Sequence, residues 1–177
     1  MIEGGGFTAS EVSFRLACMR TMGSLRNWFA VRSWRVFDES DEIGGRFVQA
    51  FMSLNVGDQT TVTTTRAEGA GPVDALTKAM RRELEKWYPA LKHIRLGTFT
   101  VAALDVSAHD SAAHVRVTLS FNADGHESWI TAGVSSDLNQ AALMAIVDGF
   151  HYWLLKQPGE AGQSARPTAA PISSEVG

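Results

Sequence analysis

Hydrophobic and polar positions alternate along this chain with two different periods. Apolar side chains recur at every second position over 28–37 and 48–56, which is typical of half-buried strands. The threonine-rich run 59–65 favours a third strand. Over 72–87 the apolar positions recur with the period of an α-helix, and Pro72 is suited to the first helical position. The pattern predicts three strands followed by an amphipathic helix.

The same order of elements then appears a second time. Strands are predicted over 93–105, 113–121 and 126–134, with a turn between the last two. A helix is predicted over 137–156, because its length and composition favour one and Gln157-Pro158-Gly159 stops it. Each half of the chain therefore predicts one βββα unit.

The spacing of equivalent residues supports a duplication. Ala75 and Ala141 hold the same place in their helices and stand 66 residues apart, and Asn55 and Asn122 stand 67 apart in their turns. We therefore predict an α+β fold in which two βββα units are related by a pseudo-twofold axis.

A helix and a tail flank the two units. Thr8 and Glu11 have capping-box spacing before a short amphipathic pattern, which predicts a helix over 9–22. The last 21 residues are rich in proline, glycine, serine and alanine without periodic apolar positions, which favours disorder. The expected organisation is a linker helix in 1–23, units at 24–89 and 90–156, and a disordered tail at 157–177.

The helix 137–156 is apolar on nearly every side. Such a helix must be covered on two faces. Either a second subunit provides the second cover, which makes this helix the dimer contact, or the chain buries the helix by itself. We expect a homodimer formed through this helix, and the sequence leaves the other arrangement open.

Composition narrows the classes of function. A chain of 177 residues fits one ordinary domain, and its net charge of −3 argues against nucleic acid as the main partner. Its one cysteine, Cys18, cannot form an internal disulfide, and no apolar run reaches the length of a membrane span. We therefore expect a cytoplasmic protein with no membrane partner.

Residue patterns for catalysis or metal binding are missing from the sequence. The five histidines lack the spacing of metal ligands, although His114 and His126 could meet across the hairpin that they flank. Cys18 has no identifiable base beside it, and no nucleophile motif is found. We predict no catalytic residue, no metal site and no cofactor.

The most informative local feature is the loop 68–72, which precedes the first unit's helix. Its small residues leave backbone N–H groups accessible at a helix N-terminus, a geometry that can receive an anion such as the carboxylate of a free amino acid. A simple turn explains the same residues.

At this loop the chain resembles the C-terminal regulatory region of the 2-isopropylmalate synthase family. The family carries a G-N-G-P-V-D-A-L type motif, and this chain has Gly69-Ala70-Gly71-Pro72-Val73-Asp74-Ala75-Leu76. Segments 86–89, 94–105 and 132–135 continue the resemblance, and segments 7–14 and 29–36 are similar to the citramalate synthase branch.

The resemblance implies a double βββα domain that pairs across a dimer axis and binds leucine or isoleucine as feedback inhibitor. On this basis the loop that receives the effector's charged groups comprises Gly69, Gly71, Val73 and Asp74. Residues that line the pocket for its aliphatic side chain are Leu96, Phe99 and Ala103.

The resemblance also implies a partner for this domain. Family members carry a metal-dependent catalytic barrel before the linker, and residues matching its histidine pair and arginine are not found in this chain. We therefore expect no synthase activity from the chain alone, and a separate catalytic barrel as a possible partner.

Two other functions remain open at this stage. Ala70 stands where the family motif has asparagine, so the domain could dimerise without binding an effector. The order helix, three strands, helix is also that of a double-stranded-RNA-binding domain, with Arg81, Arg82 and Lys86 as its phosphate contacts. The acidic net charge and the duplicated unit argue against the RNA-binding alternative.

Overall fold

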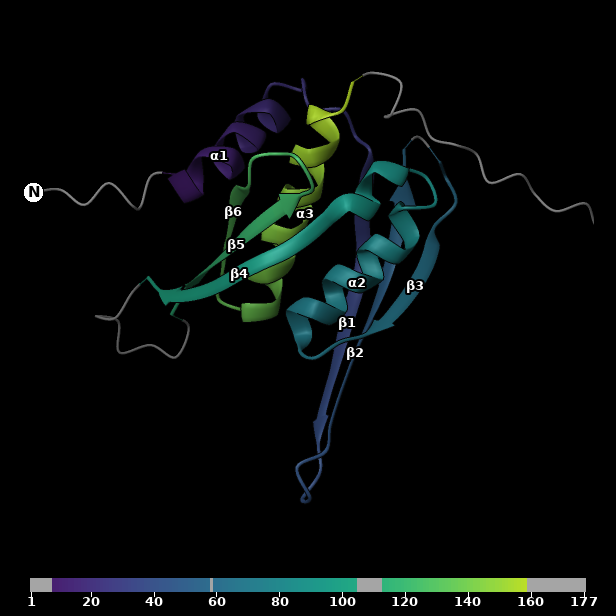
Figure 1. Ribbon diagram of the computed structural model, residues 1–177, viewed down its shortest axis with the longest axis vertical. Coiled ribbons are helices and arrows are strands. Elements are labelled where there is room, and N and C mark those ends of the chain that lie inside the picture. The colour runs from purple at the N-terminus through teal and green to yellow at the C-terminus, as the bar shows by residue number, and fades with distance from the viewer. Residues whose placement is uncertain (1–7, 58, 105–112, 159–177) are drawn as a thin grey trace, which may run out of the picture.

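Each half of the chain folds into a three-stranded antiparallel sheet with a helix packed on it (Figure 1). The computed structural model describes residues 8–57, 59–104 and 113–158. The elements in chain order are α1 (Thr8–Thr21), β1 (Phe29–Ser40), β2 (Arg46–Val56), β3 (Thr63–Glu68), α2 (Pro72–Leu84), the 3₁₀ helix η1 (Pro89–His93), β4 (Ile94–Ala103), β5 (Val115–Ala123), β6 (Trp129–Ser135) and α3 (Leu138–Lys156). This confirms the α+β fold with two βββα units.

Equivalent contacts confirm that the two units are related. The sheet orders are β1-β2-β3 and β4-β5-β6. Thr65 of β3 donates a hydrogen bond from Oγ1 to the Ala79 carbonyl of α2 at 3.1 Å, and Thr131 of β6 donates one to the Ala145 carbonyl of α3 at 2.7 Å. Thr131 and Ala145 stand 66 positions after Thr65 and Ala79, respectively. Each helix therefore lies on its sheet in the same way.

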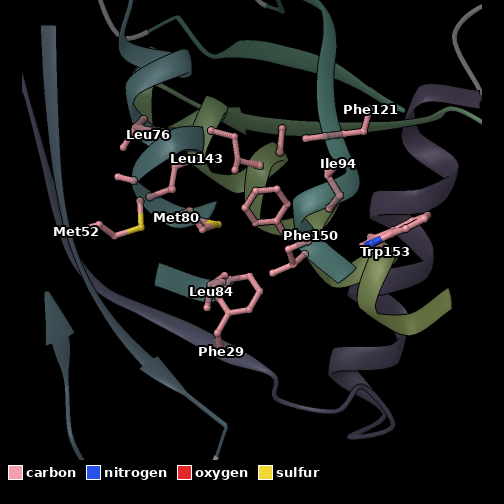
Figure 2. Close-up of a cluster of buried hydrophobic side chains, with 14 of the residues drawn as sticks. Phe29, Met52, Leu76, Met80, Leu84, Ile94, Phe121, Leu143, Phe150 and Trp153 are labelled. Atoms are coloured by element: carbon pink, nitrogen blue, oxygen red, sulfur yellow. The ribbon is translucent and has the colours of Figure 1, made fainter. Parts of the chain in front are cut away.

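One hydrophobic core joins the two units. The alternating residues of β2 and β5 point toward α2 and α3, and the two helices contact each other. Figure 2 shows side chains from both units in the same cluster, including Met80 and Leu84 of α2, Ile94 of β4 and Phe150 of α3. Because neither unit has a separate core, we expect them to fold as one domain.

The third strand of the first unit begins at residue 63, so the predicted strand 59–65 was wrong at its start. The amide of Asn55 donates hydrogen bonds to the carbonyls of Gln59 and Thr61, at 3.0 and 3.3 Å. These bonds hold the preceding segment as a loop, because a side chain replaces the strand partner of those carbonyls. β6 likewise begins at residue 129 rather than 126.

The apolar helix α3 is covered by its own chain. Its buried side chains include Leu143, Ile146, Phe150 and Trp153, and α3 packs on β5 and β6 and contacts α1, α2 and η1. The all-round apolar character that led us to expect a subunit contact along 137–156 is therefore explained within one chain. Composition alone therefore does not require a subunit contact, because α1 and α2 lie against this helix, but Leu138 and Met144 remain 43% exposed and the dimer contact along 137–156 stays a prediction.

The main contacts of α1 are with the second unit. It contacts β6 and α3, and the Ala132 backbone N–H of β6 donates to Ser13 Oγ at 3.0 Å. β6 is an edge strand, so this contact satisfies a backbone donor that its sheet leaves free. α1 is thus the described element that breaks the symmetry between the units. The tail predicted at 157–177 falls outside the described residues from 159 onward.

Candidate functional site

The loop before α2 is closed by a tight contact at one of its two glycines. The Gly69 N–H donates to the Val48 carbonyl at 3.1 Å, and a Cβ at Gly69 would lie 2.4 Å from the Ala75 backbone nitrogen. Gly71 has φ −166°, an extended conformation open to any residue, and a Cβ there would meet nothing within 4 Å. The sequence gives no reason to distinguish the two glycines, but the packing requires a glycine only at position 69.

Asp74 holds this loop against the first turn of α2. Its Oδ2 accepts hydrogen bonds from the Ala70 backbone N–H at 2.9 Å and from Lys78 Nζ at 2.7 Å. Partial burial acts to raise the pKa of Asp74, but the bonds from Lys78 and Ala70 outweigh it and leave the pKa below its usual value. The carboxylate is therefore ionised at neutral pH, and no side chain caps the helix at Gly71.

A β-bulge determines which face of β4 the predicted pocket residues occupy. Leu96 pairs with Phe121 and Phe99 with Leu119, so β4 uses three steps where β5 uses two. In a regular strand, residues three positions apart such as Leu96 and Phe99 would point to opposite faces. The bulge is held by Ser120 Oγ, which accepts from the Thr98 N–H at 2.6 Å. Consequently Leu96, Phe99 and Ala103 form one row on the face of the sheet that carries α3.

This row of β4 stays open because α3 covers only β5 and β6. Phe99 is 44% exposed and Val101 46% exposed, although their partners on β5, Leu119 and Val117, are completely buried. β4 is also an edge strand. Val101 belongs to the same row, and the alternation along the strand could have identified it.

The predicted loop and strand residues border the same hydrophobic core. Val73 and Leu96 both pack against the common hydrophobic cluster. Burial is the main cause of a lowered pKa for Arg81 of α2. This arginine is close enough to feel charges from both parts, because Asp74 raises its pKa and Arg95 of β4 lowers it. The four cavities described for this chain do not include these loop and strand residues, so the effector pocket stays a prediction.

The largest of these cavities lies elsewhere, between α1, α3 and the start of β1. Sequence reasoning missed its polar residues, which include Arg20, Arg26, Asp148 and His151. Arg20 and Asp148 form an ion pair across 128 positions of sequence. No spacing rule within one element predicts such a contact.

Other polar candidates from the sequence do not assemble into a site. His114 precedes β5, whose first residue pairs with Ser135, whereas His126 lies at the far end of that hairpin against Trp153, so the two histidines do not meet. Within 8–57, 59–104 and 113–158, no group of three metal-ligating side chains comes together. The RNA-binding alternative gains no support, because Lys86 is paired with Glu83 at 2.6 Å.

Comparisons with known proteins bear on most of the chain. The family model described as LeuA allosteric (dimerisation) domain matches residues 9–154. The (R)-citramalate synthase of Geobacter sulfurreducens is 36% identical over 155 residues, covering 87% of this chain and 29% of that enzyme. Those of Streptomyces coelicolor and Sulfolobus acidocaldarius are 33% and 32% identical, and cover 88% and 86% of this chain.

The match occupies a limited part of each relative. The chain spans 27–29% of the length of these three enzymes.

Of the helices that the structure describes, none combines the length and the hydrophobicity needed to cross a bilayer.

Proposed function

This chain belongs to the LeuA allosteric (dimerisation) domain family, the regulatory part of citramalate and 2-isopropylmalate synthases, and on that premise we propose that it binds leucine or isoleucine as a feedback effector and forms a homodimer. Its effector pocket lies between the loop 69–74 and the open row of β4. The carboxylate, the ammonium group and the side chain of an aliphatic amino acid would each contact a separate feature of this pocket.

The loop supplies the polar contacts of this proposed pocket. The first turn of α2 has backbone N–H groups without a side-chain cap, and these suit the effector's carboxylate. Asp74 is ionised and 38% exposed at its side chain, which suits the ammonium group. On β4, Leu96, Phe99 and Ala103 provide apolar surface for a branched side chain.

The observation that carries this proposal is a contact between the two units, from β1 of the first to α3 of the second. Trp34 pairs with Met52 as Phe99 pairs with Leu119, and Gln140 is equivalent to Asp74 at a distance of 66 positions. Trp34 Nε1 donates to Gln140 Oε1 at 3.2 Å. A twofold relation between the units that brings those two side chains together also directs Phe99 toward Asp74.

We assign the dimer contact to β4. Most of α3 is covered within the chain, whereas β4 has a free edge and exposed Phe99 and Val101. An edge strand with apolar side chains favours association with another chain. A pocket beside this strand would be completed or compressed by the partner, so effector binding and dimer geometry would be coupled.

The catalytic reaction belongs to another part of the enzyme in this proposal. The relatives are (R)-citramalate synthases, and this chain matches less than a third of each. The isolated chain is then expected to show no synthase activity. It would act by favouring one of two domain arrangements that a catalytic barrel reads out.

Calorimetric titration with leucine, isoleucine and valine tests effector binding. Asp74→Ala and Phe99→Ala are expected to abolish the heat of binding. Asp38→Ala is the matched control, because Asp38 forms its ion pair with Arg46 in the β1–β2 hairpin, away from the pocket. Absence of heat with all three amino acids at millimolar concentration would refute effector binding and leave a domain that only dimerises.

Light scattering tests the dimer contact independently. Val101→Lys places a charge on the open row of β4 and is expected to yield monomers. Val62→Lys is its control, because Val62 is 48% exposed and Val101 46% exposed, so both changes add the same charge to equally exposed positions. A dimer that persists in Val101→Lys excludes β4 as the contact, whatever the outcome for effector binding.

A further inference from the structure

A cavity of about 700 Å³ lies between α1, α3 and the beginning of β1. Its volume is in the range of small-molecule sites. Most of its wall is apolar, formed by Leu25, Phe29, Val31, Leu143, Met144 and Val147. A hollow with this lining suits an aliphatic group, and its selectivity must come from the few polar side chains that reach it.

Arg20 and Asp148 form an ion pair in the cavity wall, which Arg26 also lines. Arg20 Nη2 donates to Asp148 Oδ1 at 2.6 Å, and the Asp148 side chain is only 10% exposed whereas that of Arg20 is 40% exposed. Burial raises the pKa of Asp148, and Arg20 and Ser13 act in the opposite direction. The two side chains therefore differ in exposure. The carboxylate of Asp148 is buried beneath α1, and the guanidinium of Arg20 remains accessible from the cavity.

The accessible guanidinium of Arg20 has N–H groups available to a ligand. Arginine carries five N–H groups, and within the described parts of the chain a single side-chain hydrogen bond is recorded for Arg20. A guanidinium is suited to a carboxylate because two of its N–H groups can bind the two oxygens in parallel. Arg20 is thus a recognition group for an anion at one end of an apolar hollow.

His151 contributes to the cavity as a neutral ring. Its Nδ1 lies 2.9 Å from the Val147 carbonyl, and its ring stacks on Phe29 at 4.2 Å between centroids. Burial is the main cause of a pKa lowered to about 4, so the ring carries no charge at neutral pH. His151 therefore adds to the aromatic floor and does not compete with Arg20 for an anion.

The cavity lies between the two units, at the place that the pseudo-twofold axis relates to the effector pocket proposed above. Val31 and Leu96 are equivalent by their pairing with Leu54 and Phe121, and Gln140 is equivalent to Asp74. The two sites differ in charge, because the neutral Gln140 replaces the carboxylate and α1 adds Arg20. The duplicated fold has thus produced two hollows with different polar groups.

We propose that this second cavity binds a small carboxylic acid with a branched aliphatic tail. The carboxylate lies on Arg20, and the tail lies against Leu143 and Val147. A ligand held between Arg20 of α1 and the side chains of α3 fixes the position of α1 on the second unit. The proposal does not depend on the effector pocket, since the two sites have no residue in common.

Binding is tested on the 177-residue chain with three probes. 4-Methyl-2-oxopentanoate has the carboxylate and branched tail, leucine adds an ammonium group, and 3-methyl-1-butanol has the tail alone. Because Trp34 donates to Gln140 in the cavity wall, its indole N–H signal, assigned with Trp34→Phe, reports on the site. A shift with either acid but not with the alcohol is expected, and comparison of the two acids identifies the preferred ligand.

A double variant tests the role of Arg20. Arg20→Met with Asp148→Asn removes both charges together, so neither is left buried without its partner. Binding of the preferred acid is expected to weaken at least about tenfold, the effect of losing a charge-assisted hydrogen bond. If this variant does not fold, Met144→Trp fills the cavity from a position that is 43% exposed, with the same expected loss.

Other results would overturn the proposal or separate it from the effector pocket. Unchanged affinity in a folded double variant excludes Arg20, and absence of a Trp34 shift with both acids at about 10 mM excludes the site. Asp74→Ala should leave the Trp34 shift intact. A shift that disappears with Asp74→Ala but not with Arg20→Met/Asp148→Asn assigns all binding to the effector pocket and refutes a second site.

Discussion

The charge state of His151 allows a quantitative test of the core between α1, β1 and α3. The pKa of this side chain falls from 6.5 to about 4, mainly because the ring is buried. The unfolded chain therefore binds a proton below pH 6.5 that the folded chain does not bind until about pH 4. The His151 contribution to the free energy of unfolding is fully present above pH 6.5 and is lost as pH falls toward 4.

The size of this loss follows from the shift in pKa. One pKa unit corresponds to about 1.4 kcal/mol, so the wild-type protein should lose roughly 2 kcal/mol from this group by pH 5 and about 3 kcal/mol by pH 4. His151→Phe removes the titration while keeping a ring to stack on Phe29. Urea unfolding of both proteins between pH 7.5 and 4 measures the difference.

Asp148 acts in the opposite direction near the same site. Its pKa is raised by burial, so its contribution to stability is present at low pH and is lost as pH rises through that raised pKa. Asp148 and Arg20 are the same in both proteins, and their effect should largely cancel in the difference between wild type and His151→Phe. Parallel stability profiles for the two proteins would refute the assignment of His151 as a buried neutral ring.

Two matched pairs of substitutions test the packing. Gly69→Ala should lower the free energy of unfolding by roughly 1–3 kcal/mol, because its Cβ meets the Ala75 backbone, whereas Gly71→Ala should change it little; equal melting temperatures would contradict the loop geometry. Trp153 donates to a carbonyl of η1 at 2.9 Å, whereas the equivalent Trp87 has a buried Nε1 without a hydrogen-bond partner among the described residues. Trp153→Phe should therefore cost about 1 kcal/mol more than Trp87→Phe in urea unfolding, and an equal cost would exclude the hydrogen bond.

The candidate site could be predicted in part. The resemblance singled out Asp74 and Phe99, and the structure shows how the loop and the strand present them. The bulge that aligns Leu96 with Phe99 could not be foreseen, because it depends on a hydrogen bond from Thr98 to a neighbouring strand. The open row on β4 also required the structure, since it depends on where α3 ends its coverage of the sheet.

The sequence by itself determined the local elements and their duplication, because side-chain periodicity and the 66-residue spacing are properties of neighbouring residues. It also indicated the family, through a contiguous motif at 69–76. Tertiary structure alone decided what covers α3, which strand stays open, and that Arg20 meets Asp148 across 128 positions. These contacts depend on how whole elements pack. Because hydrophobic burial is non-directional, the sequence of an apolar helix does not specify which surface will cover it.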